Sequence, residues 1–279
     1  MKNNNHIQYL PMFMCFGLSF GTVFGLMTGN QALGMSIGMC IGVCVGTLLD
    51  AQKRRKKELK AIVFDFDYTL GDSTEAIVIS ANYALEKLGY PVKSTEDISK
   101  TIGMRIKDIY TTLTGVESVE ELPLFDQYFV EKINMIVADY SELYPDTKTV
   151  LKNLKERGYK TAIVTTKKNN QVCQILGKCD AMDLFDMIVG SDDVQVEKPD
   201  PKGLLKVLEE WNLKKDEILY VGDSIVDAKT AKNAGVRFAA VLTGTTAKEE
   251  HEKYKCEIIT ANLEEVFRYI IELEEDKNE

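Results

Sequence analysis

Four short apolar runs of this chain each stop abruptly at polar residues, and this pattern constrains the fold more than any other feature. Such runs are typical of strands buried in a sheet, and helix-like segments alternate with them. The runs are 61–64, 160–164, 187–189 and 218–221, and the helix-like segments are 149–157, 201–211 and 225–234. Alternating strands and helices predict right-handed βαβ units around a parallel sheet, and therefore an α/β fold.

The polar residues behind these runs are predicted to gather at one edge of the sheet. Asp65 and Asp67 follow the first run, Thr165 follows the run at 160–164, and Asp223 follows the run at 218–221. Ligands of open parallel sheets bind outside the carboxyl ends of the strands, so these side chains should share one site. Lys198 lies on the loop behind the run at 187–189 and is expected to reach the same place.

Composition excludes several classes of function. The formal net charge of −9 argues against a general nucleic-acid binder, which needs a basic face. The six cysteines form no C-x-x-C pair, which indicates reduced thiols of a cytosolic domain. His6 and His251 are the two histidines of the sequence, and neither lies in a motif typical of a Ser-His-Asp hydrolase or a histidine-rich metal site.

Glycine recurs at every fourth residue in the first fifty residues, in two sets that are offset by seventeen residues. The sets are 17, 21, 25 and 29, followed by 34, 38, 42 and 46. Steps of four place the glycines of a set on one stripe of a helix. In water each glycine would weaken the helix by about 0.8–1 kcal/mol, whereas in lipid the stripe lets another helix approach closely.

The stretch from Ile7 to Leu49 contains no charged residue and is too long for one membrane span of roughly 20 residues. We predict a hairpin of helices near Tyr9–Met27 and Ala32–Leu49, with a turn at 28–31. Each helix would be about 27–29 Å long at 1.5 Å per residue, against a hydrocarbon core of ~30 Å. We therefore expect a membrane anchor, and self-association through the glycine stripes is a further expectation.

The basic run at 53–57 sets the expected orientation of this anchor. By the positive-inside rule it would face the cytoplasm, and the rest of the chain would then be cytoplasmic at the cell membrane. Three other interpretations of the apolar segment stay open: a signal peptide, a soluble self-assembling segment, and a re-entrant or surface-bound hairpin. A hairpin that does not insert would leave the chain in the cytoplasm.

The ordered motifs of the remaining chain resemble those of the haloacid dehalogenase-type (HAD-like) phosphohydrolase superfamily, in its phosphoglycolate phosphatase-like branch with a helical cap. The motifs are Asp65-x-Asp67-x-Thr69, Thr165, Lys198 and Gly222-Asp223-Ser224-x-x-Asp227. The resemblance covers residues from about 59 to the C-terminus and implies a Rossmann-like parallel sheet with an alpha-helical cap insert. Tyr68 departs from the family pattern, in which glycine is commoner at this position.

The resemblance implies a Mg²⁺-dependent phosphatase that works through an aspartyl-phosphate. Asp65 would attack the phosphorus, and Asp67 would act as general acid and then as general base. Thr165 and Lys198 would bind the phosphoryl group and neutralise its charge. Asp65, the main-chain carbonyl of Asp67, and Asp223 would hold Mg²⁺, with Asp227 in support.

The resemblance and the apolar segment together divide the chain. We expect the hairpin at 1–52, a basic linker at 53–59, the catalytic core at 60–71 and 145–279, and the cap at 72–144. So small a cap favours a small phosphorylated metabolite as substrate, with phosphoglycolate, pyrophosphate, sugar phosphates and nucleotide monophosphates all open. A phosphomutase and a membrane-tethered scaffold on the same fold are the alternatives. Arg105 and Lys107 of the cap are candidates for contact with an anionic substrate, although solvent-facing charges are the commoner case.

Overall fold

The computed structural model describes residues 9–54 and 58–275, and it divides into two compact units between Glu58 and Leu59. Of the predicted basic linker, residues 55–57 lie outside the described residues. The predicted limits of the cap and the core stay predictions.

The first unit contains two helices, and helices and strands alternate through most of the second unit. The helices are α1 Tyr9–Thr28, α2 Gln31–Arg54, α3 Thr74–Lys87, α4 Thr95–Ser99, α5 Ile106–Thr114, α6 Leu122–Ile136, α7 Thr147–Glu156, α8 Asn169–Lys178, α9 Lys202–Glu210, α10 Ile225–Ala234, α11 Lys248–His251 and α12 Leu263–Glu275, with the 3₁₀ turns η2 Met182–Leu184, η3 Ser191–Asp193 and η4 Lys215–Glu217. The strands are β1 Ala61–Phe64, β2 Gly71–Asp72, β3 Glu142–Leu143, β4 Lys160–Val164, β5 Met187–Val189, β6 Ile218–Gly222, β7 Arg237–Val241 and β8 Ile258–Thr260.

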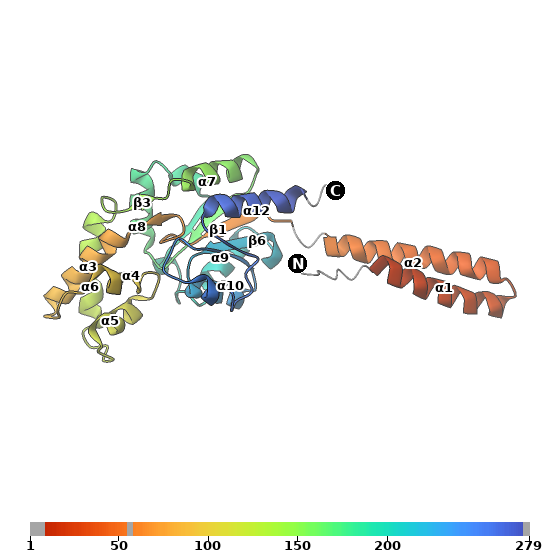
Figure 1. Cartoon of the computed structure of the whole chain (residues 1–279), viewed down its shortest axis with the longest axis horizontal. Coiled ribbons are helices and arrows are strands. Elements are labelled where there is room, and N and C mark those ends of the chain that lie inside the picture. Colours follow the sequence, from red (N-terminus) through yellow and green to blue (C-terminus); the bar gives the residue numbers. More distant parts are fainter. Residues whose placement is uncertain (1–8, 55–57, 276–279) are drawn as a thin grey trace. The chain divides into compact units, whose positions relative to one another are not determined.

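The first unit is a hairpin of α1 and α2, which lie side by side (Figure 1). Both helices are long and apolar enough to cross a membrane by length and composition, with mean hydropathy 1.7 for Tyr9–Thr28 and 2.0 for Gln31–Leu49. The turn between them begins with Gly29 at a φ of 75°, a left-handed conformation that glycine adopts without strain. Asn30 then caps α2, because its side chain accepts a hydrogen bond from the main-chain N–H of Leu33.

The two glycine stripes of the hairpin pack against each other. A Cβ added to Gly17 would overlap the main-chain carbonyl of Gly38, and one added to Gly21 would overlap that of Gly34. Gly42 and Gly46 meet the backbone of Phe13 and Leu10 in the same way. The repeat of four residues therefore permits backbone-to-backbone packing within the chain, as small residues do between membrane helices.

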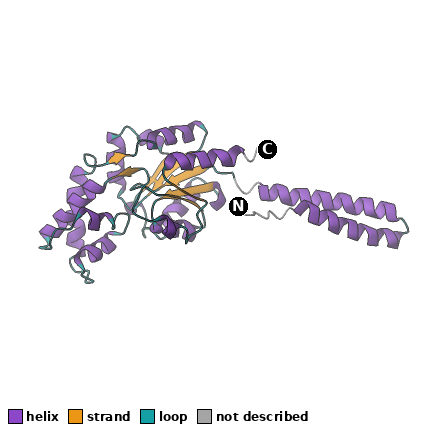
Figure 2. Ribbon diagram, in the orientation of Figure 1, coloured by secondary structure: helices purple, strands orange, loops and turns teal. Residues whose placement is uncertain are grey.

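The second unit is built on a six-stranded parallel sheet in the order β5-β4-β1-β6-β7-β8, which confirms the predicted α/β fold (Figure 2). β1 is central, with Phe64 in register with Ile163 of β4 and with Val221 of β6. Both neighbours of β1 in the sheet, β4 and β6, are therefore far from it in sequence. The order reverses at β1, and such a switch point is where ligands of open α/β sheets bind.

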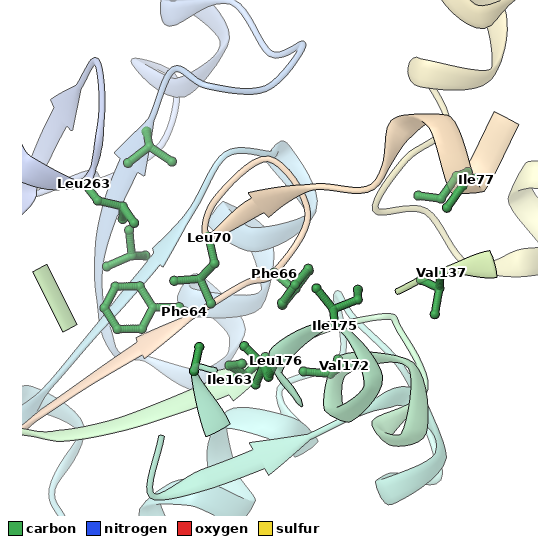
Figure 3. Close-up of a cluster of buried hydrophobic side chains, with 14 of the residues drawn as sticks. Phe64, Phe66, Leu70, Ile77, Val137, Ile163, Val172, Ile175, Leu176 and Leu263 are labelled. Atoms are coloured by element: carbon green, nitrogen blue, oxygen red, sulfur yellow. The ribbon is translucent and has the colours of Figure 1, made fainter. Parts of the chain in front are cut away.

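Successive residues of β1 face opposite sides of the sheet, and each side carries its own apolar cluster. Ile62 and Phe64 belong to the cluster that includes residues of α7, α8 and α12, part of which Figure 3 shows. Ala61 and Val63 belong to the cluster under α9 and α10. Helices therefore cover both faces, as the continuous apolar runs of a parallel sheet require.

The cap helices α3 to α6 are inserted between β1 and β4 and group beside the sheet (Figure 1). The chain leaves the core through β2 and returns through β3, and these two short strands pair, with Gly71 opposite Leu143. A Cβ on Gly71 would overlap the carbonyl of Glu142, so glycine is needed for this pairing. Thr147 at the start of α7 also donates a hydrogen bond to the carbonyl of Leu70, at 2.7 Å.

Several predicted helix boundaries differ from the structure, most of them by one or two residues. α2 runs to Arg54 rather than ending at Leu49. α9 begins at Lys202, one residue later than predicted, with Pro201 at the N-cap position. Asp200 still accepts a hydrogen bond from the main-chain N–H of Lys202 at 3.0 Å, so it stabilises the helix start from one residue further out.

We expect Gly38→Leu to separate the helices of the hairpin, because its side chain cannot fit against the carbonyl of Gly17. Met39→Leu is the matched control, since Met39 is exposed. Spin labels at the exposed Ser19 and Ser36, in a cysteine-free full-length chain in detergent, report the separation. We expect the distance to grow by roughly 2–4 Å in Gly38→Leu, in line with the dependence of helix packing distance on side-chain size. An unchanged distance would refute the glycine contact.

Candidate active site

The loop behind β1 turns tightly and places two carboxylates at the carboxyl edge of the sheet. The main-chain N–H of Asp65 donates to the carbonyl of Val221 in β6, at 2.9 Å, so Asp65 continues the strand pairing. The N–H groups of Leu70 and Gly71 then donate back to the carbonyl of Phe66. The side chains of Asp65 and Asp67 are both buried.

Tyr68 lies in this loop with a φ of 56°, in the left-handed region. Few residues other than glycine, asparagine and aspartate adopt this conformation readily, which explains why glycine suits the position. Two contacts hold the loop at Tyr68. Its hydroxyl accepts a hydrogen bond from Thr74 at the start of α3, at 2.8 Å, and its carbonyl accepts one from Thr243. The ring therefore links the acidic loop to the cap.

Lys198 is buried between two carboxylates. Its Nζ lies 2.8 Å from Oδ1 of Asp65 and 2.7 Å from Oδ1 of Asp227. Burial alone would lower the pKa of the ammonium group, but the charges of Asp227 and Asp65 raise it above its ordinary value. The loop behind β5 thus delivers a permanent positive charge to the end of β1.

Asp227 is held by four donors and has little capacity left for a further ligand. Its Oδ1 accepts hydrogen bonds from Lys198 and from the Tyr220 hydroxyl, the latter at 2.8 Å. Its Oδ2 accepts from the N–H and the hydroxyl of Ser224, at 3.1 and 2.5 Å. Burial opposes ionisation, but Lys198 and these hydrogen bonds lower the pKa of Asp227 overall. Ser224 also caps α10, because its hydroxyl accepts from the N–H of Asp227.

Asp65, Asp223 and Asp227 bring carboxylate oxygens within 4.8 Å of one another. Burial raises the pKa of Asp65 to about 7, with Lys198 acting in the opposite direction. Burial together with the charges of Asp227 and Asp65 also raises the pKa of Asp223 well above its ordinary value. Gly244 lies directly against Asp223, and a Cβ at this position would overlap its Oδ2. Glycine is therefore needed at position 244, because any larger residue there would overlap the Asp223 carboxylate.

Asp67 faces a different cation. Its Oδ2 lies 3.1 Å from Nζ of Lys167, and both side chains are buried. Its Oδ1 has no hydrogen-bond partner among the described residues. Asp67, Lys167 and residues of the cap line a cavity of about 140 Å³. One carboxylate oxygen of Asp67 is thus anchored to the core while the other is left for a further partner.

The sheet brings the predicted residues together as expected from their positions at strand ends. Asp65, Lys198, Asp223 and Asp227 form one cluster, and Asp67 lies at its edge through the pair with Lys167. Thr165 is buried behind β4, and its hydroxyl accepts a hydrogen bond from the N–H of Lys167 at 3.3 Å. Their chemical roles stay predictions. Arg105 of the cap is held by both carboxylate oxygens of Asp108, at 2.7 and 3.2 Å.

Four residues of the site were missed in the sequence. Lys167 stands two residues behind Thr165 at the same strand end, so its position in the sequence could have indicated it. Tyr220 lies inside β6, Gly244 follows β7, and His251 ends α11, where no motif draws attention to them. His251 is buried with its Nε2 3.0 Å from the carbonyl oxygen of Asp223, and burial lowers its pKa.

Lys198→Met should destabilise the fold strongly, because it leaves the carboxylates of Asp65 and Asp227 buried without their cation. Removing one partner of a buried ion pair typically costs about 3–5 kcal/mol of unfolding free energy. Lys100→Met is the control, since Lys100 forms an exposed ion pair with Glu96 and should change stability far less. Urea denaturation of both variants measures the difference. Equal stability of the two would show that the buried cation does not hold the carboxylates.

Comparison with known proteins gives one consistent family. The family model for haloacid dehalogenase-like hydrolases matches residues 62–241. A phosphoglycolate phosphatase from Aquifex aeolicus is 31% identical over 187 residues, which are 67% of this chain and 86% of that protein. The pyrophosphatase PpaX from Bacillus cereus is 31% identical over 198 residues, which are 71% of this chain and 89% of that protein.

A solved structure shows the same likeness in three dimensions. A protein from Bacteroides fragilis, described as a haloacid dehalogenase-like hydrolase, is 35% identical in sequence and superimposes with a TM-score of 0.73. The superposition covers 75% of this chain and all of that one. The parallel sheet, the acidic cluster at its carboxyl edge and these relatives lead to one conclusion: the chain is an enzyme of the haloacid dehalogenase-like hydrolase family.

Proposed function

We propose that this enzyme hydrolyses a small phosphomonoester, with Mg²⁺ and through a phosphorylated Asp65. The observation that carries the proposal is the position of Asp65, buried at the end of the central strand beside a lysine and two further carboxylates. A carboxylate in such a place can act as a nucleophile towards phosphorus, provided that its negative charge and that of the substrate are compensated.

The charges of the site fit one divalent cation. Asp65, Asp223 and Asp227 would carry three negative charges when ionised, and the buried ammonium group of Lys198 compensates one of them, whereas Lys167 is paired with Asp67. Burial, together with the charges of the neighbouring carboxylates, raises the pKa of Asp65 and of Asp223, so a cation at this place would favour their ionised forms.

The donor groups also suit Mg²⁺, which prefers hard oxygen ligands. We assign Asp65, Asp223 and the main-chain carbonyl of Asp67 as the ligands. Asp227 then supports them, since its oxygens are already engaged with Lys198, Tyr220 and Ser224. When bound, Mg²⁺ would screen the repulsion between the nucleophile and the phosphoryl oxygens.

Asp65 would attack phosphorus and form an acyl phosphate, while the bond from phosphorus to the ester oxygen breaks. Asp67 would give its proton to the departing oxygen, and would then take a proton from the water that hydrolyses the acyl phosphate. Its free Oδ1 is the atom that suits this exchange, because Oδ2 is paired with Lys167. Lys198 and Thr165 would bind phosphoryl oxygens and stabilise the charge of the transition state.

The other functions that the fold supports differ in their products. A phosphomutase would return the phosphoryl group to a sugar phosphate, and a pyrophosphatase would release two phosphates from one substrate. A scaffold without activity is disfavoured by the full set of charged groups at the sheet edge. Because two relatives are named a phosphoglycolate phosphatase and a pyrophosphatase, phosphoglycolate and pyrophosphate belong among the first substrates to be tested.

Asp65→Asn should abolish release of phosphate from a generic aryl phosphate, because an amide does not act as the nucleophile. We expect a loss of at least about 10³-fold, which corresponds to ~4 kcal/mol in the activation barrier. The assay compares full-length wild type and variant with and without Mg²⁺, and circular dichroism verifies that the variant is folded. Turnover by folded Asp65→Asn, or full activity of wild type in excess chelator, would refute the respective assignment.

We further propose that the hairpin attaches the enzyme to a membrane. Phe16, Phe20 and Phe24 recur at steps of four along α1, and their exposed fractions are 64%, 84% and 53%. A contiguous apolar surface of this kind is unfavourable in water and suits lipid. An apolar groove of about 450 Å³, lined by these rings and by glycines of both helices, adds to that surface.

Cell fractionation tests this attachment directly. We expect the full-length chain in the membrane pellet, released by detergent but not by high salt or carbonate, because apolar burial rather than charge holds it. A chain that starts at Glu58 should be found in the supernatant. Equal solubility of the two chains would exclude membrane attachment through the hairpin.

A further inference from the structure

The cavity beside Asp67 has a composition that bears on the substrate. It lies between helices α3, α5 and α6 of the cap and the loops behind β4 and β5 of the core, and its volume is about 140 Å³. Asp67 lines it and is 5% exposed, with Oδ1 lacking a hydrogen-bond partner among the described residues. If Asp67 protonates the departing oxygen, as proposed above, this cavity receives the group that is esterified to the phosphate.

Most of the wall that the cap contributes is apolar. It comprises Ile77, Ile102, Met104, Ile106, Phe129 and Val130, together with Ile109 and Ile133. The volume is close to that of a ~150 Å³ cavity that holds one benzene molecule. The cavity therefore has room for a departing group of up to about six non-hydrogen atoms, with a carbon skeleton that contacts these side chains.

Two carboxylates interrupt the apolar wall. Asp126 comes from α6 of the cap and Glu197 from the loop that carries Lys198. Neither side chain forms an ion pair or a hydrogen bond with another residue in the part of the chain that the structure describes. Burial raises the pKa of Glu197. The positive charge of Arg105 acts to lower this pKa, and the negative charge of Asp126 acts to raise it further.

The cations near these carboxylates do not balance them. Lys167 is engaged with Asp67, and the guanidinium of Arg105 is held by Asp108. Lys168 also lines the cavity and adds one positive charge against the two carboxylates. One negative charge is left over, and a bound group that shielded these half-buried carboxylates from water without compensating this charge would be disfavoured.

We propose that this cavity selects phosphomonoesters whose departing group is small and carries an amine, and that it disfavours departing groups with a carboxylate or a second phosphate. An ammonium group between Asp126 and Glu197 would supply the missing positive charge while the carbon skeleton contacts the apolar wall. A carboxylate in the same place would meet two like charges. The inference rests on the proposed phosphatase activity and specifies its substrate class.

Three nearly isosteric substrates test this selection with the full-length enzyme and Mg²⁺. They are 2-aminoethyl phosphate, propyl phosphate and phosphoglycolate, whose departing groups differ mainly in a charge of plus one, zero or minus one. We expect kcat/KM to fall in that order, with at least about a tenfold difference between the first and the last. Pyrophosphate should be turned over no faster than phosphoglycolate.

Variants connect the preference to the two carboxylates. Asp126→Asn and Glu197→Gln should each reduce the ratio of kcat/KM between 2-aminoethyl phosphate and phosphoglycolate by about threefold or more. Glu131→Gln is the matched control on α6, because Glu131 is exposed, does not line the cavity and should leave the ratio unchanged.

The outcomes separate this inference from the proposed function. If an aryl phosphate is hydrolysed but phosphoglycolate or pyrophosphate is preferred over 2-aminoethyl phosphate, the amine selection is overturned while the phosphatase activity stands. The same holds if the predicted order appears but neither Asp126→Asn nor Glu197→Gln changes it. If no phosphomonoester, aryl phosphate included, is hydrolysed, the proposed function itself fails and the inference fails with it.

Discussion

The buried ammonium of Lys198 between Asp65 and Asp227 is the interaction on which the site depends. A parallel sheet with β1 at its switch point brings the acidic ends of β1 and β6 side by side, and carboxylates so placed repel one another. Lys198 offsets part of this repulsion from a loop behind β5. In the proposed function, a divalent cation would offset the repulsion that is left between the carboxylates.

A cavity lies where the cap meets this core. Asp67 is where the two meet, since one of its oxygens is held by Lys167 of the core and the other lies at the cavity that the cap covers. Tyr68 links them again through its hydrogen bond with Thr74. In the proposed mechanism, residues at the strand ends would supply the reacting groups, and the cap helices would supply the walls around the departing group.

Much of the fold and the site could be predicted, because the signals are local. Short strand-like runs of three to five residues predicted the strands, and the groups behind them predicted Asp65, Thr165, Lys198 and Asp223 at one sheet edge. The glycine steps of four predicted a hairpin, and the structure packs the two stripes against each other. Helix ends were less certain: α2 passes Leu49 because nothing in its sequence breaks a helix before Arg54.

The sequence by itself determined the parallel α/β fold, the hairpin and the acids at the sheet edge, because strand periodicity and chain order carry that information over short distances. Only the tertiary structure decided which cation pairs with which acid, that His251 reaches the carbonyl of Asp223, and that Asp126 and Glu197 share one cavity. The physical reason is that electrostatic pairing and cavity shape depend on distances between residues far apart in the chain, which only packing sets.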